Sequence, residues 1–150
     1  MYDANATLRT ARAEYFARSG FPADGGYGDA WVKVKLAGRF VPAFPNLPSR
    51  VRAVKLHDLH HIVTGYDTSW TGEAEIAAWE LASGCRSYVA AWLLNLGGLA
   101  IGLLIAPRRT MRAFARGRST RNLYRVEFNE ALLERIVGEL RAELGLNPTA

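Results

Sequence analysis

One stretch of this chain constrains its fold more than any other: the 21 residues from Ser87 to Pro107 carry no charged side chain. That run is long enough to cross a bilayer, since a membrane-spanning helix needs about 20 apolar residues. It equally suits a buried core helix, a helix lining a lipid pocket, or a helix lying in the membrane interface. A span would take a main core helix away from a chain of 150 residues, so we expect the pocket or the interface.

The length and an ordinary composition predict one domain over residues 1–150. Hydrophobic residues make up 49% and charged residues 22%, which excludes wholesale disorder. The single cysteine, Cys85, excludes an internal disulfide framework and a cysteine-based zinc site. Residues 1–20 contain Asp3 and Glu14 and lack the apolar core of a signal peptide, which favours a cytoplasmic start.

Signals for the starts and ends of helices along the chain predict an all-α fold. Thr71 and Asn129 are candidate N-caps, and glycines follow the expected helix ends. Residues 31–36 alternate between apolar and polar side chains, which leaves a strand or the end of a helix open. Residues 19–29 are a loop by composition. The expected helices cover residues 4–18, 48–64, 71–84 and 129–144, besides the apolar run, and Gly145 and Pro148 stop the last of them.

Basic residues gather in one segment. Residues 108–125 carry seven arginines and no acidic residue, whereas residues 57–107 carry one basic and five acidic residues. The block suits a solvated face, or a surface for anionic lipids or isoprenoid phosphates. No nucleic-acid-binding motif accompanies it, so we expect no nucleic-acid partner. The seven are Arg108, Arg109, Arg112, Arg116, Arg118, Arg121 and Arg125.

All three histidines fall within five residues. His57 and His61 are four apart and share one face of a helix, a recurring metal-binding geometry, whereas His60 points elsewhere and is not an expected ligand. Asp58 lies about 100° round the helix from His57. An antiparallel helix pair would bring Glu73, twelve residues after His61, opposite the two imidazoles. This set suits Zn²⁺, Fe²⁺ or Mn²⁺, and histidines without a metal are the alternative.

The pattern His-Asp-x-x-His, eleven residues, then Glu resembles the signature of the Coq-four family of ubiquinone (coenzyme Q) biosynthesis proteins. The resemblance covers about residues 49–146 and departs at His60, which replaces a nonpolar residue of the family pattern. Its further agreements are Gly65, Thr68 and Gly72 in the loop before Glu73, the segment Asn122-Leu123-Tyr124, and the ending Glu143-Leu144-Gly145.

The resemblance implies a metal site at His57, Asp58, His61 and Glu73, with Zn²⁺ favoured over Fe²⁺ or Mn²⁺. It implies metal-dependent oxidative decarboxylation at C1 of a polyprenylated 4-hydroxybenzoate intermediate, by a peripheral protein on the cytoplasmic face of the bacterial inner membrane. Expected partners are that polyprenylated quinone precursor or another isoprenoid lipid, the membrane surface, other ubiquinone-biosynthesis enzymes and a second copy of the chain.

Two alternatives remain open at this level. One is a non-catalytic, lipid-binding scaffold for other ubiquinone-biosynthesis enzymes. The other is a metal-dependent phosphohydrolase, because His57-Asp58 also resembles the dyad of the all-helical HD phosphohydrolases, although the chain has no histidine before His57. In the leading hypothesis, the tail of the substrate follows the apolar side chains Leu93, Leu96, Leu99 and Leu103.

Overall fold

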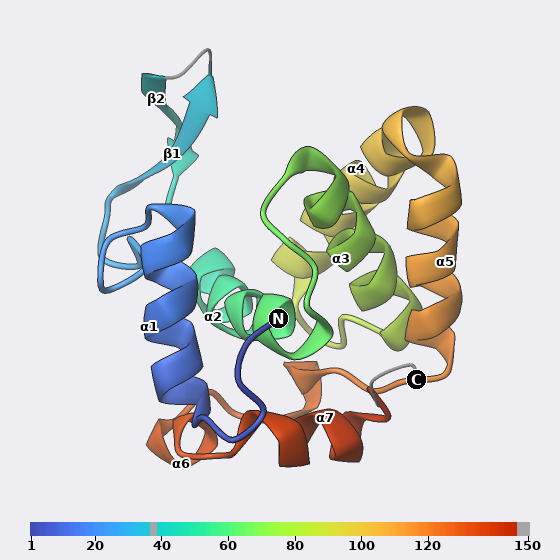
Figure 1. Ribbon diagram of the computed structural model, residues 1–150. Helices are drawn as coiled ribbons and strands as arrows, with labels where there is room; N and C mark the ends of the chain where they lie inside the picture. Colours follow the sequence, from blue (N-terminus) through green and yellow to red (C-terminus); the bar gives the residue numbers. More distant parts are fainter. Residues whose placement is uncertain (37–38, 147–150) are drawn as a thin grey trace.

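The computed structural model describes residues 1–36 and 39–146, with only the backbone for residues 33–36 and 39–44. The fold is mostly helical, as predicted (Figure 1). In chain order, the elements are α1 (Leu8–Ser19), β1 (Trp31–Leu36), β2 (Arg39–Pro45), α2 (Pro48–Thr64), α3 (Trp70–Ser83), α4 (Val89–Ile105), α5 (Pro107–Arg118), the 3₁₀ turn η1 (Leu123–Arg125), α6 (Glu130–Leu133) and α7 (Val137–Leu144).

A two-stranded hairpin corrects the expectation of a purely helical chain. Strands β1 and β2 pair antiparallel, from Trp31 opposite Pro45 to Leu36 opposite Arg39. The alternation in residues 31–36 therefore marks a strand, which was one of the two interpretations left open. The hairpin projects away from the helices in Figure 1 and is separate from the histidine cluster on α2.

Most predicted helix ends are confirmed, and two starts are wrong. Gly65 ends α2 at a φ of 80°, in the left-handed region that suits glycine. Helix α3 begins two residues earlier than expected, because Ser69 caps it by accepting a hydrogen bond from the Gly72 amide. Thr71 consequently lies inside that helix. Helix α1 likewise begins after the cap Thr7, not at residue 4.

The C-terminal helix is divided in two. Asn129 caps only the short α6, and a new helix, α7, begins at Val137. The interruption arises because the backbone there pairs with the N-terminal segment: Leu8 donates to the Arg135 carbonyl at 2.8 Å, and Val137 donates to the Ala6 carbonyl at 3.0 Å. Gly145 ends α7 as expected, and Pro148 lies outside the described residues.

Helix α2 lies between α1 on one side and α3 on the other, and α7 crosses one end of the molecule (Figure 1). Its residues Leu56, Leu59 and Ile62 are fully buried, as is Trp79 of α3. Each side chain of this kind contributes about 1.5–3 kcal/mol through burial. Helix α2, which carries the three histidines, is therefore held in place by the hydrophobic core around it.

Helix α4 packs on α3 through small residues. A Cβ at Gly98 would lie 2.6 Å from the Cβ of Ala77, and one at Gly102 would lie 2.6 Å from that of Ala74. These glycines therefore permit close contact between the two helices.

The outer face of α4 is apolar and exposed. Only Ala91, Asn95 and Gly102 of this helix are buried. Leu93, Leu96 and Leu103, the expected lining for a lipid tail, lie on the molecular surface instead. Within the described residues, no helix combines the length and hydropathy needed to cross a bilayer. The exposed apolar residues of α4 are Val89, Trp92, Leu93, Leu94, Leu96, Ile101, Leu103, Leu104 and Ile105.

Candidate metal centre

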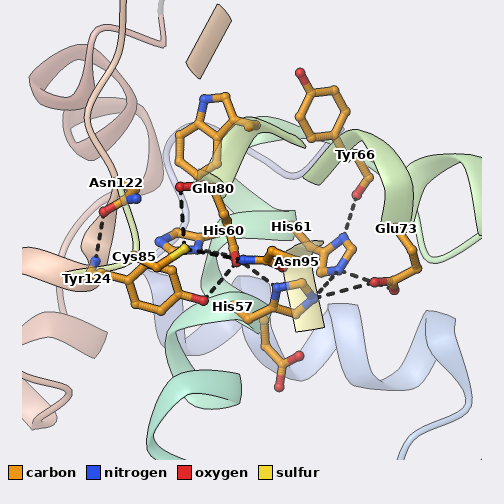
Figure 2. A network of polar contacts seen from close by, with 12 residues as sticks. His57, His60, His61, Tyr66, Glu73, Glu80, Cys85, Asn95, Asn122 and Tyr124 are labelled. Atoms are coloured by element: carbon orange, nitrogen blue, oxygen red, sulfur yellow. Dashed lines mark hydrogen bonds and ion pairs between the residues drawn. The ribbon is translucent and has the colours of Figure 1, made fainter. Parts of the chain in front are cut away.

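Three of the predicted residues converge between α2 and α3, as Figure 2 shows for His57, His61 and Glu73. The Nε2 atoms of the two histidines are 3.2 Å apart. Glu73 Oε1 lies 3.4 Å from Nε2 of His61, and Glu73 Oε2 lies 3.5 Å from Nε2 of His57. One face of α2 and the first turn of α3 therefore bring two imidazoles and a carboxylate to one point.

These separations suit a divalent ion. Ligand atoms about 2.0–2.1 Å from a tetrahedral zinc lie about 3.3 Å from one another. The shortest distances between His57, His61 and Glu73, which involve both oxygens of Glu73, fall within 0.2 Å of that spacing. A set of two histidines and one carboxylate also suits Fe²⁺, so the geometry supports a metal without choosing which one.

Hydrogen bonds on the far side of each ring decide which nitrogen faces the site. Nδ1 of His61 donates to the backbone carbonyl of Tyr66 at 3.0 Å, and Nδ1 of His57 donates to Glu80 Oε1 at 2.9 Å. Each neutral ring then directs an Nε2 lone pair toward the other. Two lone pairs at this distance repel unless a cation, a proton or a metal ion, lies between them.

The charges around the site favour that cation. Burial lowers the pKa of His57, but Glu80 and Glu73 outweigh it and raise this pKa well above its usual value. Burial raises the pKa of Glu73, but the adjacent His57 and His61 imidazoles outweigh it and bring this pKa far below the ordinary range. Glu73 therefore stays ionised. Its side chain is 44% exposed, whereas His61 is buried, so the group is open to solvent at Glu73.

Glu80 supports the site from behind and was missed by the sequence analysis. Its fully buried carboxylate accepts four hydrogen bonds: Oε1 from His57 and His60, and Oε2 from Asn95 at 2.5 Å and Tyr124 at 2.8 Å. Burial raises the pKa of Glu80, but the two histidines outweigh it and bring it well below the usual value. Its spacing of seven residues from Glu73, two helical turns, was the available signal.

His60 lies outside the metal group and is fully buried. Its Nε2 accepts a hydrogen bond from the Leu123 amide at 2.9 Å, so its proton is on Nδ1, which donates to Glu80 at 2.6 Å. Burial lowers its pKa and keeps the ring neutral. Asn122 anchors the same segment by donating to Ser83 and to the Gly84 carbonyl.

Asp58, expected as a fourth ligand, faces another direction. Its carboxylate accepts hydrogen bonds from Tyr27 at 2.5 Å and Tyr15 at 3.4 Å. The reason is helical geometry, because one residue beyond His57 is about 100° further round α2. The ring of Tyr15 in turn stacks on His61 at 5.4 Å. The structure thus brings together three of the four predicted residues and leaves Asp58 outside the metal group.

Comparison with known proteins adds no family to these observations. No protein-family model matches this chain, and no curated protein matches it. The functional conclusion therefore depends on the geometry of His57, His61 and Glu73 and on the sequence pattern around them.

Proposed function

We propose that this protein is a metal-dependent enzyme of ubiquinone biosynthesis that removes the C1 carboxylate of a polyprenylated 4-hydroxybenzoate intermediate. The observation that carries the proposal is the convergence of two oriented Nε2 lone pairs and one ionised carboxylate. The pathway is supported by the resemblance of the His-Asp-x-x-His and Glu73 pattern to the Coq-four family. The proposal takes Zn²⁺ as the metal, with Fe²⁺ or Mn²⁺ as alternatives that the same donor set suits.

In this proposal, the bound ion supplies Lewis acidity toward the phenolate or carboxylate of the substrate. His57 and His61 would hold the ion with rings of fixed orientation, because Glu80 and the Tyr66 carbonyl restrain them. The exposed side of Glu73 admits the substrate. The bond from C1 to the carboxylate breaks, carbon dioxide leaves and an oxygen is added at C1. An oxygen-donating, two-electron oxidant from outside the protein balances the reaction.

The surface of α4 supports a peripheral position on the cytoplasmic face of the inner membrane. Its exposed apolar face lies beside α5, whose Arg108 and Arg112 are exposed. Apolar side chains enter the interface and nearby arginines attract anionic lipid headgroups, at about 1 kcal/mol for each cation. A substrate with a polyprenyl tail has to be taken from the bilayer, so this surface suits the proposed chemistry.

A scaffold role is the second candidate, because the exposed face of α4 also suits a partner enzyme or a second copy of the chain. The phosphohydrolase alternative loses support, since Asp58 binds Tyr15 and Tyr27 and does not join His57 at the metal group.

The test is a lipid extract of a deletion strain. We expect loss of ubiquinone and accumulation of a prenylated intermediate that retains its C1 carboxylate. The wild-type gene is expected to restore ubiquinone, and a Glu73→Ala variant expressed at the same level is not. Glu139→Ala, which changes an exposed glutamate of α7, is the matched control and should restore it. Rescue by Glu73→Ala would favour the scaffold, and normal ubiquinone in the deletion strain would contradict the pathway.

A further inference from the structure

A cavity of about 130 Å³ lies near the C-terminal end of the described chain, among η1, α6 and α7. Its apolar lining consists mainly of four buried leucines, Leu123, Leu132, Leu140 and Leu144. Its polar lining includes three arginines and one acidic residue, Arg121, Arg125, Arg135 and Glu143.

The three arginines around this cavity outnumber its one acidic side chain, Glu143. Glu143 pairs with Arg135 at 2.6 Å, and Arg121 donates to the backbone carbonyl of Glu143, also at 2.6 Å. The Arg125 side chain makes no hydrogen bond, ion pair or ring contact in the part of the chain that the structure describes. Glu143 is thus the one carboxylate beside Arg121 and Arg135, and Arg125 lacks an acidic side-chain partner, which favours an anion there.

We propose that this cavity binds a small organic anion that consists of one carboxylate or phosphate group on an apolar body no larger than a single ring. The guanidinium groups of Arg125 and Arg121 suit the planar, two-oxygen geometry of such a head group. The leucines suit the apolar body. A dry cavity of about 150 Å³ is known to hold a benzene ring, so a volume of about 130 Å³ limits the ligand to that size.

This cavity is separate from the metal group. Leu123 lines the cavity with its side chain, while its backbone amide donates to His60 on the side of the metal centre. His60 and Glu80 lie between that amide and the ligand His57. The proposal therefore goes beyond the enzymatic function and stands without it.

The test is a calorimetric titration of the full-length protein with sodium benzoate against sodium chloride at equal ionic strength. We expect saturable binding of one benzoate per chain. Acetate, which has the carboxylate without the ring, should bind about tenfold more weakly because the leucines gain no contact. Arg125→Gln should weaken benzoate binding at least about tenfold, since a hydrogen-bonded charge is lost.

Arg112→Gln is the matched control, because it removes an exposed arginine of α5 that does not line the cavity. It should leave benzoate binding unchanged. Amide chemical shifts provide a second readout, and benzoate should perturb Leu123 and Leu140 more than the residues of α4. Absence of benzoate binding, equal loss in both variants, or shift changes away from the cavity would overturn the proposal.

Discussion

At the residue scale, one buried carboxylate organises the candidate metal centre. Glu80 accepts from four side chains on three different elements, α2, α4 and η1, and one of these is His57 of the candidate metal group. A fully buried carboxylate is costly unless donors surround it, and here all the donors point inward. The same contacts fix the orientation of the His57 ring, so stability and metal binding share one group.

Replacing Glu80 by glutamine tests this role. The amide nitrogen of glutamine would face donors that need an acceptor, so we expect a loss of about 2 kcal/mol in unfolding free energy. The orientation of His57 should loosen, and metal affinity should fall about 10–100-fold. Urea unfolding measures the first effect, and competition with a chromophoric chelator measures the second. Unchanged metal affinity would show that Glu80 serves stability alone.

The metal group itself predicts different outcomes for neighbouring residues. Purified protein should bind about one divalent ion per chain, measured by elemental analysis after dialysis. His61→Ala should abolish binding, because only His57 and Glu73 of the described metal group would then remain. Asp58→Asn should retain the ion, since the Asp58 carboxylate faces Tyr15 and Tyr27. Loss of the ion in Asp58→Asn would place Asp58 among the ligands after all.

The raised pKa of His57 predicts a pH dependence of metal binding. Below that pKa the metal-free ring carries a proton, which a metal ion has to displace. Apparent affinity should therefore rise with pH and level off once the pH passes the pKa of His57. Titration calorimetry in buffers of different ionisation enthalpy should show release of about one proton per ion at neutral pH. A pH-independent affinity would contradict this competition.

At the element scale, α4 has an unusual distribution of side chains. Its buried side carries small residues and Asn95, while its large apolar residues face outward. Helix α5 continues directly from it and carries arginines with different roles. Arg109 pairs with Glu75 and Arg116 donates to the Thr64 carbonyl, so these two also support the fold. Arg108 and Arg112 are the cleaner probes of a membrane surface.

The double substitution Arg108→Gln and Arg112→Gln should weaken binding to anionic vesicles about 30-fold, since each cation contributes about 1 kcal/mol. Leu104→Asp, at a site 85% exposed, should weaken binding while leaving the folded state stable. Co-sedimentation with phosphatidylglycerol vesicles measures both effects, and high salt should release the wild-type protein. Retention after a carbonate wash, or no binding by wild type, would contradict the interfacial position.

At the scale of the whole molecule, α7 caps the C-terminal end of α2. The last carbonyls of a helix lack partners within it, and here arginines supply the donors. Arg141 of α7 donates to the carbonyls of Ile62 at 2.9 Å and Val63 at 3.1 Å, and Arg116 donates to that of Thr64 at 3.1 Å. The last turn of α2 follows directly after His61, so the contacts from α7 and α5 support the candidate metal centre.

Arg141→Met keeps much of the apolar stem and removes those donors. Two buried carbonyls then lose a charged partner, and we expect a loss of about 2–3 kcal/mol in unfolding free energy. Arg112→Met, at an exposed position of α5, should change it by less than about 0.5 kcal/mol. Chemical denaturation followed by circular dichroism compares them. An equal effect of both variants would mean that the contacts of Arg141 contribute nothing specific.

Local features of the sequence were sufficient for much of the fold and part of the site. Glycines at Gly20, Gly65 and Gly145 mark helix ends, because the left-handed conformation found there is a local property of the backbone. The i, i+4 spacing of His57 and His61 puts both on one face for the same reason, since the helical period is local. The position of Glu73 in the first turn of the next helix completes the metal group.

Tertiary structure decided what spacing does not contain. Glu80, Asn95 and Tyr124 meet from separate elements, and no period relates their positions. The partners that Asp58 meets on its own side of α2 also depend on tertiary structure, because Tyr15 and Tyr27 come from earlier in the chain. The apolar run predicts a helix, but which face α4 buries depends on the small residues of α3 that it packs against. Sequence patterns determine the faces of a helix, whereas packing between distant segments determines what each face contacts.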